Sequence, residues 1–506
     1  MNTRQSGLLL QYGRRSVIRA VYGRLAYAIW AFTMVVALDA APPPTRLEAR
    51  LLTSISSYSS RSGDGIEAQV ITPWCLDDGG VLPEGAVISG TILRVRRVGL
   101  GLLHETASLR LAFTGLRFPD GRSFPVEAAL IAIDNARERV DAHGMIHGTR
   151  ATASISNRVI QHMVFNTLGH PAAMVPLVLL EAGVFHFPDP EITYRRGTEL
   201  YVDLEAPAEL GHTRVCPVLS AANDEDRASL GRLVGALPYW SYTQRQSQPS
   251  DLVNLMFTGS RQAIDNAFAA AGWTGSQPNS FRSGVNAIRA IAEDRSFADA
   301  PMRTLLLDGE EPEISLQKSL NTFEKRHHLR IWSRPGEWQG EAVWASAATH
   351  DTAATFSFRR PFGFTHQIQN AVDLERDKVV SDLAYTGCVD SVTYIDRPES
   401  VRGSGQNYRR GVNSDARVAV VSLNACRQPR LSLAGGPDEP APSGFVRAFR
   451  RVTLTARNHF LRDNIFWRSG DAMRIGILAL RDWRRERRDE RRGREMDVRL
   501  TAAISH

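Results

Sequence analysis

Residues 326–332 read Arg-His-His-Leu-Arg-Ile-Trp, and this mixture of charged and apolar side chains predicts a β-strand with two distinct faces. Alternate residues of an extended chain point to opposite faces. The two faces here carry His328, Arg330 and Trp332 on one side, and His327, Leu329 and Ile331 on the other. Only one of the two adjacent histidines can therefore enter a given site.

The surrounding stretch from Glu324 to Asp382 adds further imidazoles and carboxylates. His350 and Asp351 follow a second predicted strand over residues 342–348, so that His350 shares a face with Trp344, Ser346 and Ala348. After His366, Asp373 is expected to cap a helix on which Asp377 lies one turn further along. Such a cluster can serve acid/base chemistry, a metal ion or a network of structural ion pairs.

A hydrolytic site can be assembled from five of these residues. His328 or His366 would transfer protons, Asp351 or Asp377 would orient the imidazole, and Arg330 would hold an anionic oxygen. One or two of the imidazoles with the carboxylates could instead bind a divalent metal, although no His-x-x-x-His or His-Glu-x-x-His spacing specifies one. The third interpretation is that the arginines and carboxylates pair with one another and the histidines only donate hydrogen bonds.

Residues 240–435 are predicted to form a mixed α+β domain around this cluster. Ser260 can cap a helix that ends at Gly272, and a second helix is expected from Ser283 with Val285, Ile288 and Ile291 facing inward. Short strands are expected at 304–307, 329–332 and 342–348.

Residues 45–215 are predicted to form an all-β barrel or sandwich. Candidate strands cover 68–71, 87–95, 109–114 and 191–204, and turns rich in Gly and Pro separate them, as at Pro119-Asp120-Gly121-Arg122. The apolar stretch within 158–187 is not expected to span a membrane, because Glu181 and Gly169-His170-Pro171 interrupt it. The overall prediction is therefore an α+β protein with a β domain first.

Residues 1–41 have the order of an export signal. Four arginines between Arg14 and Arg24 precede an apolar run from Leu25 to Leu38, and Pro42-Pro43-Pro44 follows. The alternative is an uncleaved membrane anchor, because Leu38 stands where a small residue is preferred before cleavage after Ala40. Both interpretations place the rest of the chain in the periplasm or cell envelope.

The chain of 506 residues has a net charge of +7, with arginines densest near its two ends. Residues 440–506 are expected to be a basic, partly helical tail that could contact an anionic membrane surface, although interleaved acidic residues favour a solvated helix. Of the four cysteines, Cys388 and Cys426 are the preferred disulfide pair, with free buried thiols as the alternative.

Several motifs between Asp251 and Pro398 resemble the LssY-like C-terminal domain family, a bacterial group often attached to membrane or envelope modules. They are Asp251-Leu252-Val253-Asn254-Leu255, Gly259-Ser260-Arg261, Ala271-Gly272-Trp273, residues 326–332, Ala347-Ala348-Thr349-His350-Asp351, Thr365-His366-Gln367-Ile368 and Asp373-Leu374-Glu375-Arg376-Asp377. The turns at 82–90 and 116–122 are similar to those of extracytoplasmic β domains of envelope proteins.

The resemblance implies an envelope association and supplies no reaction. We expect an exported binding or assembly module whose partner is an envelope component or an anionic small molecule, with no specific nucleic acid. The alternative is a hydrolase that acts on a phosphorylated or lipid-linked envelope substrate through His328, Arg330, Asp351, His366 and Asp377. The sequence names no cofactor and leaves metal dependence open.

Overall fold

The computed structural model describes the chain from residue 47 onward, with gaps. The described residues are 47–71, 74–76, 85–100, 104–154, 188–205, 213–215, 223–244, 248–278, 280–318, 321–357, 363–397, 412–426 and 444–458, with 477, 480, 481, 483, 484 and 487 as single positions. The predicted leader, the apolar stretch at 158–187 and most of the predicted tail lie outside these residues. No described helix is long and apolar enough to cross a membrane.

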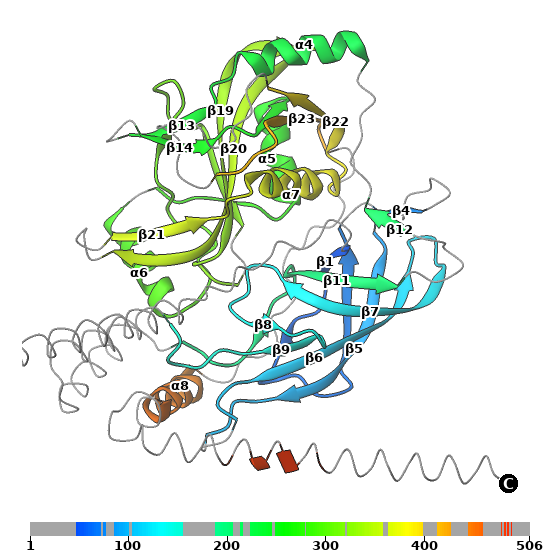
Figure 1. Ribbon diagram of the computed structural model, residues 1–506, viewed down its shortest axis with the longest axis vertical. Coiled ribbons are helices and arrows are strands. Elements are labelled where there is room, and N and C mark those ends of the chain that lie inside the picture. The colour runs from blue at the N-terminus through cyan, green and yellow to red at the C-terminus, as the bar shows by residue number, and fades with distance from the viewer. Residues whose placement is uncertain are drawn as a thin grey trace, which may run out of the picture. The chain divides into compact units, whose positions relative to one another are not determined.

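The first part of the chain forms a closed antiparallel barrel, which confirms the predicted β domain (Figure 1). The strands follow the order β5-β3-β1-β11-β7-β6, and pairing of β5 with β6 closes the ring. Their bounds are β1 Leu47–Leu51, β3 Gly65–Val70, β5 Val87–Arg96, β6 Ser108–Arg117, β7 Ser123–Ile133 and β11 Glu199–Glu205. Apolar side chains from all six strands fill the interior, among them Leu47, Ile66, Ile88, Phe113, Leu130 and Val202.

Short strands complete the barrel domain. They are β2 Ile55–Ser56, β4 Trp74–Leu76, β8 Arg139–Val140, β9 Met145–His147, β10 Thr193–Tyr194 and β12 Thr213–Val215. Where β5 and β6 cross closely, Gly90 is required, because a Cβ at this position would lie 1.9 Å from the carbonyl oxygen of Ala112. The turn predicted at 119–122 is present, with Gly121 at φ 90°.

The second part of the chain is built on an eight-stranded mixed sheet. Its order is β16-β18-β19-β20-β15-β23-β22, with β21 paired to β20, and only β15 and β23 are parallel. The bounds are β15 Leu255–Thr258, β16 Thr274–Gly275, β18 Ile314–Lys318, β19 Arg326–Trp338, β20 Glu341–Ser357, β21 Gly363–Ile368, β22 Val389–Asp396 and β23 Arg417–Leu423. The predicted α+β character of this domain is therefore confirmed, and the strands around residues 329 and 345 are longer than expected.

Helices and a small sheet cover the two faces of this sheet (Figure 1). On one face, α5 (Arg261–Ala270) and α7 (Val372–Ala384) pack on Leu329, Ile331 and Trp344. On the other face, α4 (Asp224–Gly235) and the strands β14 (Pro249–Leu252), β13 (Trp240–Thr243) and β17 (Leu305–Leu306) pack near Trp332 and Ala345. Two further helices are α6 (Phe281–Ala292) and α8 (Gly444–Asn458).

The helix termini confirm one prediction and correct two. Ser260 caps α5, and its hydroxyl accepts from the backbone N–H of Ala263. Helix α6 begins at Phe281 with Ser280 as its cap, so the start predicted at Ser283 is wrong, and Val285 is exposed rather than inward. Asp373 does not cap α7, which begins at Val372, because the Asp373 carboxylate accepts from Ser414 and from the backbone of Asp415.

A disulfide joins Cys388 and Cys426, which confirms the preferred pair. Cys388 lies just before β22 and Cys426 shortly after β23, and these strands are antiparallel neighbours. The register brings the two Cα atoms to 4.2 Å. The bond therefore links two strands at the edge of the large sheet.

Candidate functional site

The two faces of β19 carry two different polar clusters, as the alternation of residues 326–332 predicts. Antiparallel pairing sets His327 opposite His350 and His328 opposite Thr349 on β20. Directly opposed residues share a face, so His327 and His350 point to the side of α7 and His328 and Thr349 to the other side. The imidazoles and carboxylates between Glu324 and Asp382 thus do not form one site.

Asp351 is the centre of the first cluster, which we call the Asp351 cluster. Its members are Arg326, His328, Thr349, Asp351 and His366. The Asp351 Oδ2 atom lies 3.1 Å from Arg326 Nε, 3.4 Å from His366 Nδ1 and 3.6 Å from His328 Nδ1. Only the first of these distances is accompanied by a hydrogen bond, and both imidazole Nδ1 atoms are buried without a hydrogen-bond partner.

Burial and charge set the protonation states of this cluster. Burial lowers the pKa of His328 to about 4, and it also lowers the pKa of His366. Burial alone would raise the pKa of Asp351, but the two neighbouring imidazoles and Arg326 outweigh it and bring this pKa to about 2. At neutral pH the cluster therefore holds an ionised carboxylate beside two neutral imidazoles. Only His366 keeps an appreciable exposed side-chain fraction, 20%.

Arg330 is buried on the same face of the sheet but belongs to a pair of its own. Its Nη1 donates to Asp251 Oδ2 at 2.9 Å, and its Nε and Nη2 donate to the carbonyl oxygen of Arg303. Asp251 in turn accepts from the hydroxyl of Ser250. The guanidinium is thus already occupied by protein acceptors, which leaves it little capacity to hold a substrate oxygen.

Asp377 lies away from the other four predicted site residues. It is half exposed on α7, where it accepts from Arg376 Nε at 2.8 Å and from the hydroxyl of Tyr394 at 3.0 Å. Arg376 is itself buried and also binds Asp415. The structure therefore brings His328, Asp351 and His366 together, places Arg330 beside them on the same face, and leaves Asp377 in a separate ion-pair group.

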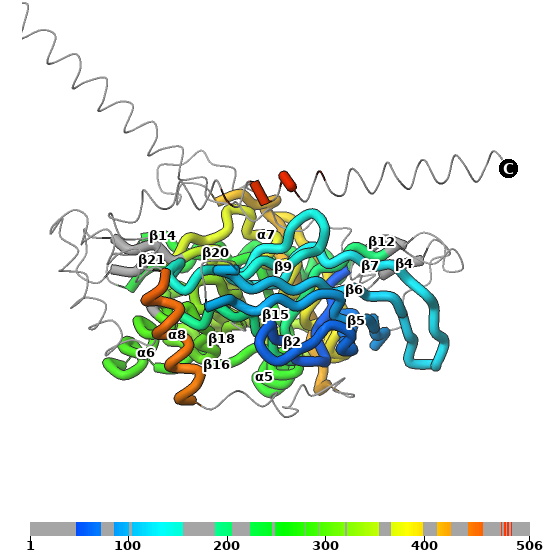
Figure 2. Tube along the Cα trace, turned by 90° about the horizontal axis from the view of Figure 1, so that it is seen from below, coloured from blue at the N-terminus to red at the C-terminus, as the bar shows by residue number. Residues whose placement is uncertain are grey.

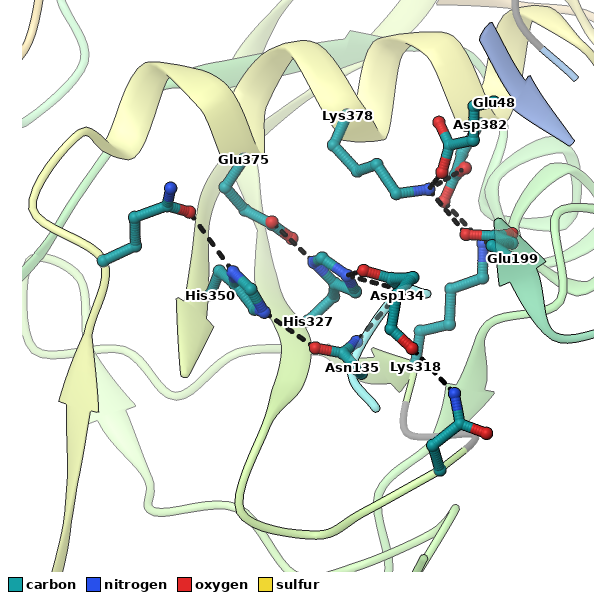
Figure 3. A network of polar contacts seen from close by, with 12 residues as sticks. Glu48, Asp134, Asn135, Glu199, Lys318, His327, His350, Glu375, Lys378 and Asp382 are labelled. Carbon is teal, nitrogen blue, oxygen red and sulfur yellow. Dashed lines mark hydrogen bonds and ion pairs between the residues drawn. The ribbon is translucent and has the colours of Figure 1, made fainter. Parts of the chain in front are cut away.

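The second polar cluster joins the barrel to the large sheet (Figure 3). His327 Nδ1 lies 2.7 Å from Glu375 Oε2 on α7, and its Nε2 lies 3.0 Å from Asp134 Oδ2, just after barrel strand β7. With a carboxylate at each nitrogen, both nitrogens must donate, so His327 is an imidazolium. Burial would lower its pKa, yet Glu375 and Asp134 raise it well above the usual value.

His350 stacks on His327 and is held by the next barrel residue. The ring centroids are 4.3 Å apart and nearly parallel, and His350 Nε2 lies 2.8 Å from Asn135 Oδ1. Burial and the charge of His327 lower the pKa of His350, so this imidazole is neutral. Asn135 adopts a positive φ of 52°, a conformation that asparagine tolerates better than most residues. The loop after β7 thus supplies one partner for each histidine.

A second group of charges extends the same junction. Lys378 on α7 binds Glu48, Glu199 and Asp382 at 2.7 Å each, and Lys318 on β18 binds Glu199 and Asp382. Arg50 on β1 also donates to Glu199. These side chains are almost fully buried. We refer to them, together with His327, His350, Glu375, Asp134 and Asn135, as the junction network.

Two groups of described residues have enough potential ligands close together to hold a metal ion. In the first, His327, His350 and Glu375, both nitrogens of His327 donate to carboxylates, so this imidazolium has no lone pair left for a metal ion. In the second, Glu48, Glu199 and Asp382, the ammonium groups of Lys318 and Lys378 already occupy the space between the carboxylates. The residues present do not fit a metal in either place, and the Asp351 cluster is not one of these groups.

A comparison of the sequence with models of known protein families finds a match in the region that carries these clusters. Residues 236–411 match the family model described as LssY C-terminus. Residues 236–411 therefore belong to an LssY C-terminal domain. No curated protein matches the chain. The match covers the Asp351 cluster and the α7 side of the junction network, whereas Glu48, Asp134 and Glu199 precede it.

Proposed function

We propose that this protein is an exported binding or assembly module of the bacterial cell envelope, in which the barrel and the LssY domain act as one body. The observation that supports this proposal is the junction network. Barrel carboxylates at Asp134 and Glu199 are the partners of buried cations of the LssY domain at His327, Lys318 and Lys378. Such buried pairs fix the relative orientation of two domains, which suits a protein that presents a fixed surface to a partner.

The disulfide supports the export part of the proposal. Disulfides persist in oxidising compartments and are rare in the bacterial cytosol. N-terminal sequencing of the protein isolated from the envelope is expected to give a mature start close to Pro42. An intact Met1 would argue for the uncleaved anchor, and recovery of the chain from the cytosol with Cys388 and Cys426 reduced would contradict export.

Cross-linking in intact cells tests the assembly role. The wild-type chain is expected to migrate in a cross-linked complex larger than the monomer, and Glu199→Gln is expected to lose this complex because the junction loosens. Glu67→Gln is the matched control, since Glu67 is an exposed barrel carboxylate in a surface ion pair. A wild-type chain that stays monomeric under cross-linking would contradict the proposal.

A hydrolase remains the second candidate, and the partly exposed His366 beside ionised Asp351 is the observation that favours it. The test is release of phosphate from p-nitrophenyl phosphate and from phosphatidic acid. Activity that His366→Asn abolishes and that His143→Asn, an exposed histidine of the barrel, leaves unchanged would establish the hydrolase. Equal product release by the wild type and His366→Asn would exclude a hydrolase that uses His366.

A further inference from the structure

Helix α8 exposes an apolar face. Phe445 is 81% exposed and Phe449 is 67% exposed, and Val446 and Val452 are close to half exposed. Residues 445, 449 and 452 follow helical spacing, so they form one stripe along the helix. Isolated exposed apolar residues are ordinary, but a contiguous stripe with two exposed phenylalanines marks an interaction surface.

Side-chain contacts fix the opposite side of α8 to the barrel, which keeps the apolar stripe outward. Figure 2 shows the course of the α8 backbone in orange. Leu454 is fully buried in the apolar core of the barrel. Arg447 Nε binds Asp189 at 2.7 Å, and Arg450 Nη2 binds Glu191 at 2.6 Å. A helix that turned its phenylalanines inward would lose both ion pairs and the buried leucine.

The charge of α8 and of the sequence that follows it indicates which kind of partner covers the apolar stripe. Helix α8 has four arginines and no acidic residue. Arg447 and Arg450 pair with barrel carboxylates and Arg457 donates to the carbonyl oxygen of Gly99, whereas Arg451 forms no ion pair with a described residue. Residues 444–506 contain sixteen arginines and eight acidic residues, whereas residues 47–443 contain 39 basic and 45 acidic residues. The net positive charge of the sequence is therefore concentrated in residues 444–506. Exposed Ile477, Leu480 and Trp483 continue the apolar pattern among these arginines.

We propose that α8 docks on the surface of an anionic lipid bilayer, with Phe445 and Phe449 at the boundary of the acyl chains, and with Arg451 and exposed arginines of the following segment, such as Arg484 and Arg487, near the lipid phosphates. Helices with apolar aromatic residues on one face and basic residues beside them bind such interfaces. A second copy is a less suitable occupant, because pairing through this face would bring two strongly positive segments together. This role is separate from the binding role of the LssY domain.

Vesicle flotation tests the proposal with residues 43–506, which form a compact unit apart from residues 1–42. The protein is expected to float with vesicles of phosphatidylethanolamine and phosphatidylglycerol, and less so with phosphatidylcholine vesicles or in about 0.5 M NaCl, which screens surface charges. Phe445→Ser/Phe449→Ser is expected to lower the partition coefficient at least about tenfold, because two apolar side chains leave the interface.

Leu374→Ser is the matched control, since Leu374 is a 41% exposed apolar residue on α7. It should float as the wild type does, and all variants should melt at the same temperature because the altered side chains are exposed. Equal flotation of the double phenylalanine variant, or equal binding to phosphatidylcholine, would overturn the proposal. A dimer in light scattering that the double variant loses, without any vesicle binding, would assign the face to a second copy instead.

Discussion

Two adjacent histidines of one strand have opposite electrostatic roles. His327 is held charged between Glu375 and Asp134, whereas His328 is held neutral by burial beside Arg326 and Arg330. The alternation of the strand separates them by the thickness of the sheet, so each can have its own environment. A histidine pair in the sequence therefore does not indicate a shared site.

The raised pKa of His327 makes its contribution to stability dependent on pH. Between the unfolded pKa near 6.5 and the higher folded pKa, the folded protein holds a proton that the unfolded chain has lost, so this contribution declines as pH rises. His327→Gln is expected to lower the unfolding free energy by about 3 kcal/mol at pH 6 and by less at pH 9. Urea unfolding at several pH values measures the difference.

His143→Gln is the control for that experiment, because His143 is an exposed histidine in a barrel turn. Its unfolding free energy should follow the wild type at each pH. A difference between wild type and His327→Gln that stays constant from pH 6 to pH 9 would contradict the charged state that we assign to His327.

Arg330 offers a test of whether a predicted site residue is structural. Arg330→Met leaves Asp251 charged and buried, and we expect a loss of about 3–5 kcal/mol. Arg330→Met/Asp251→Leu should recover most of this loss, since neither charge then remains buried. In the exposed pair of Arg117 and Glu67, each single change should cost no more than about 1 kcal/mol. A double variant as unstable as the single one would argue against a pair that serves only to neutralise Asp251.

At the scale of elements, local patterns predicted the strands better than the helix ends. The faces of β19 and the cap of α5 depend on neighbours within a few residues, and both were predictable. The start of α7 was not, because Asp373 is engaged by Ser414 and Asp415, about forty positions away in the sequence. A capping side chain that finds a stronger tertiary partner leaves no trace in a local pattern.

The same limit applies to the candidate site. The predicted hydrolytic site included His328 and Asp351, which the structure brings close together, but no sequence pattern indicated that Arg330 is paired with Asp251. Local sequence patterns also could not predict the junction network, because His327 and Asp134 are separated by 193 residues. Asp134 follows an ordinary apolar strand, and no motif around it indicates a buried partner.

The disulfide is an element-scale constraint with a measurable effect. It closes a loop between residues 38 positions apart, and the loss of chain entropy on closure predicts a stabilisation of up to about 4 kcal/mol. Cys388→Ala/Cys426→Ala should therefore lower the unfolding free energy by about 2–4 kcal/mol in urea titrations. The reducing agent dithiothreitol should lower the unfolding free energy of the wild type by a similar amount and leave that of the double variant unchanged. Equal stability of wild type and variant would indicate that the bond does not form.

At the scale of the whole molecule, the barrel and the LssY domain have separate apolar cores joined by polar contacts. The barrel core draws on strands β1 to β11 and on Leu454 of α8, and the core beneath α5 and α7 draws only on the second part of the chain. The coupling of the two parts therefore depends on polar contacts, which are the junction network and further pairs such as Tyr385 with Gln69 and Arg137 with Asp294, rather than on a shared core.

This coupling predicts how the protein unfolds. The wild type should show one calorimetric transition, because buried charges at the junction become uncompensated if either part opens first. The double variant Asp134→Ala/Glu199→Gln removes barrel partners of His327, Lys318 and Lys378. We expect it to show two calorimetric transitions, the first several degrees below that of the wild type. Asp120→Ala/Glu67→Gln, two exposed barrel carboxylates, should keep one transition. A single unshifted transition in the junction variant would mean that contacts other than these carboxylates hold the two parts together. That result would contradict the proposal that the junction network makes the two parts one body.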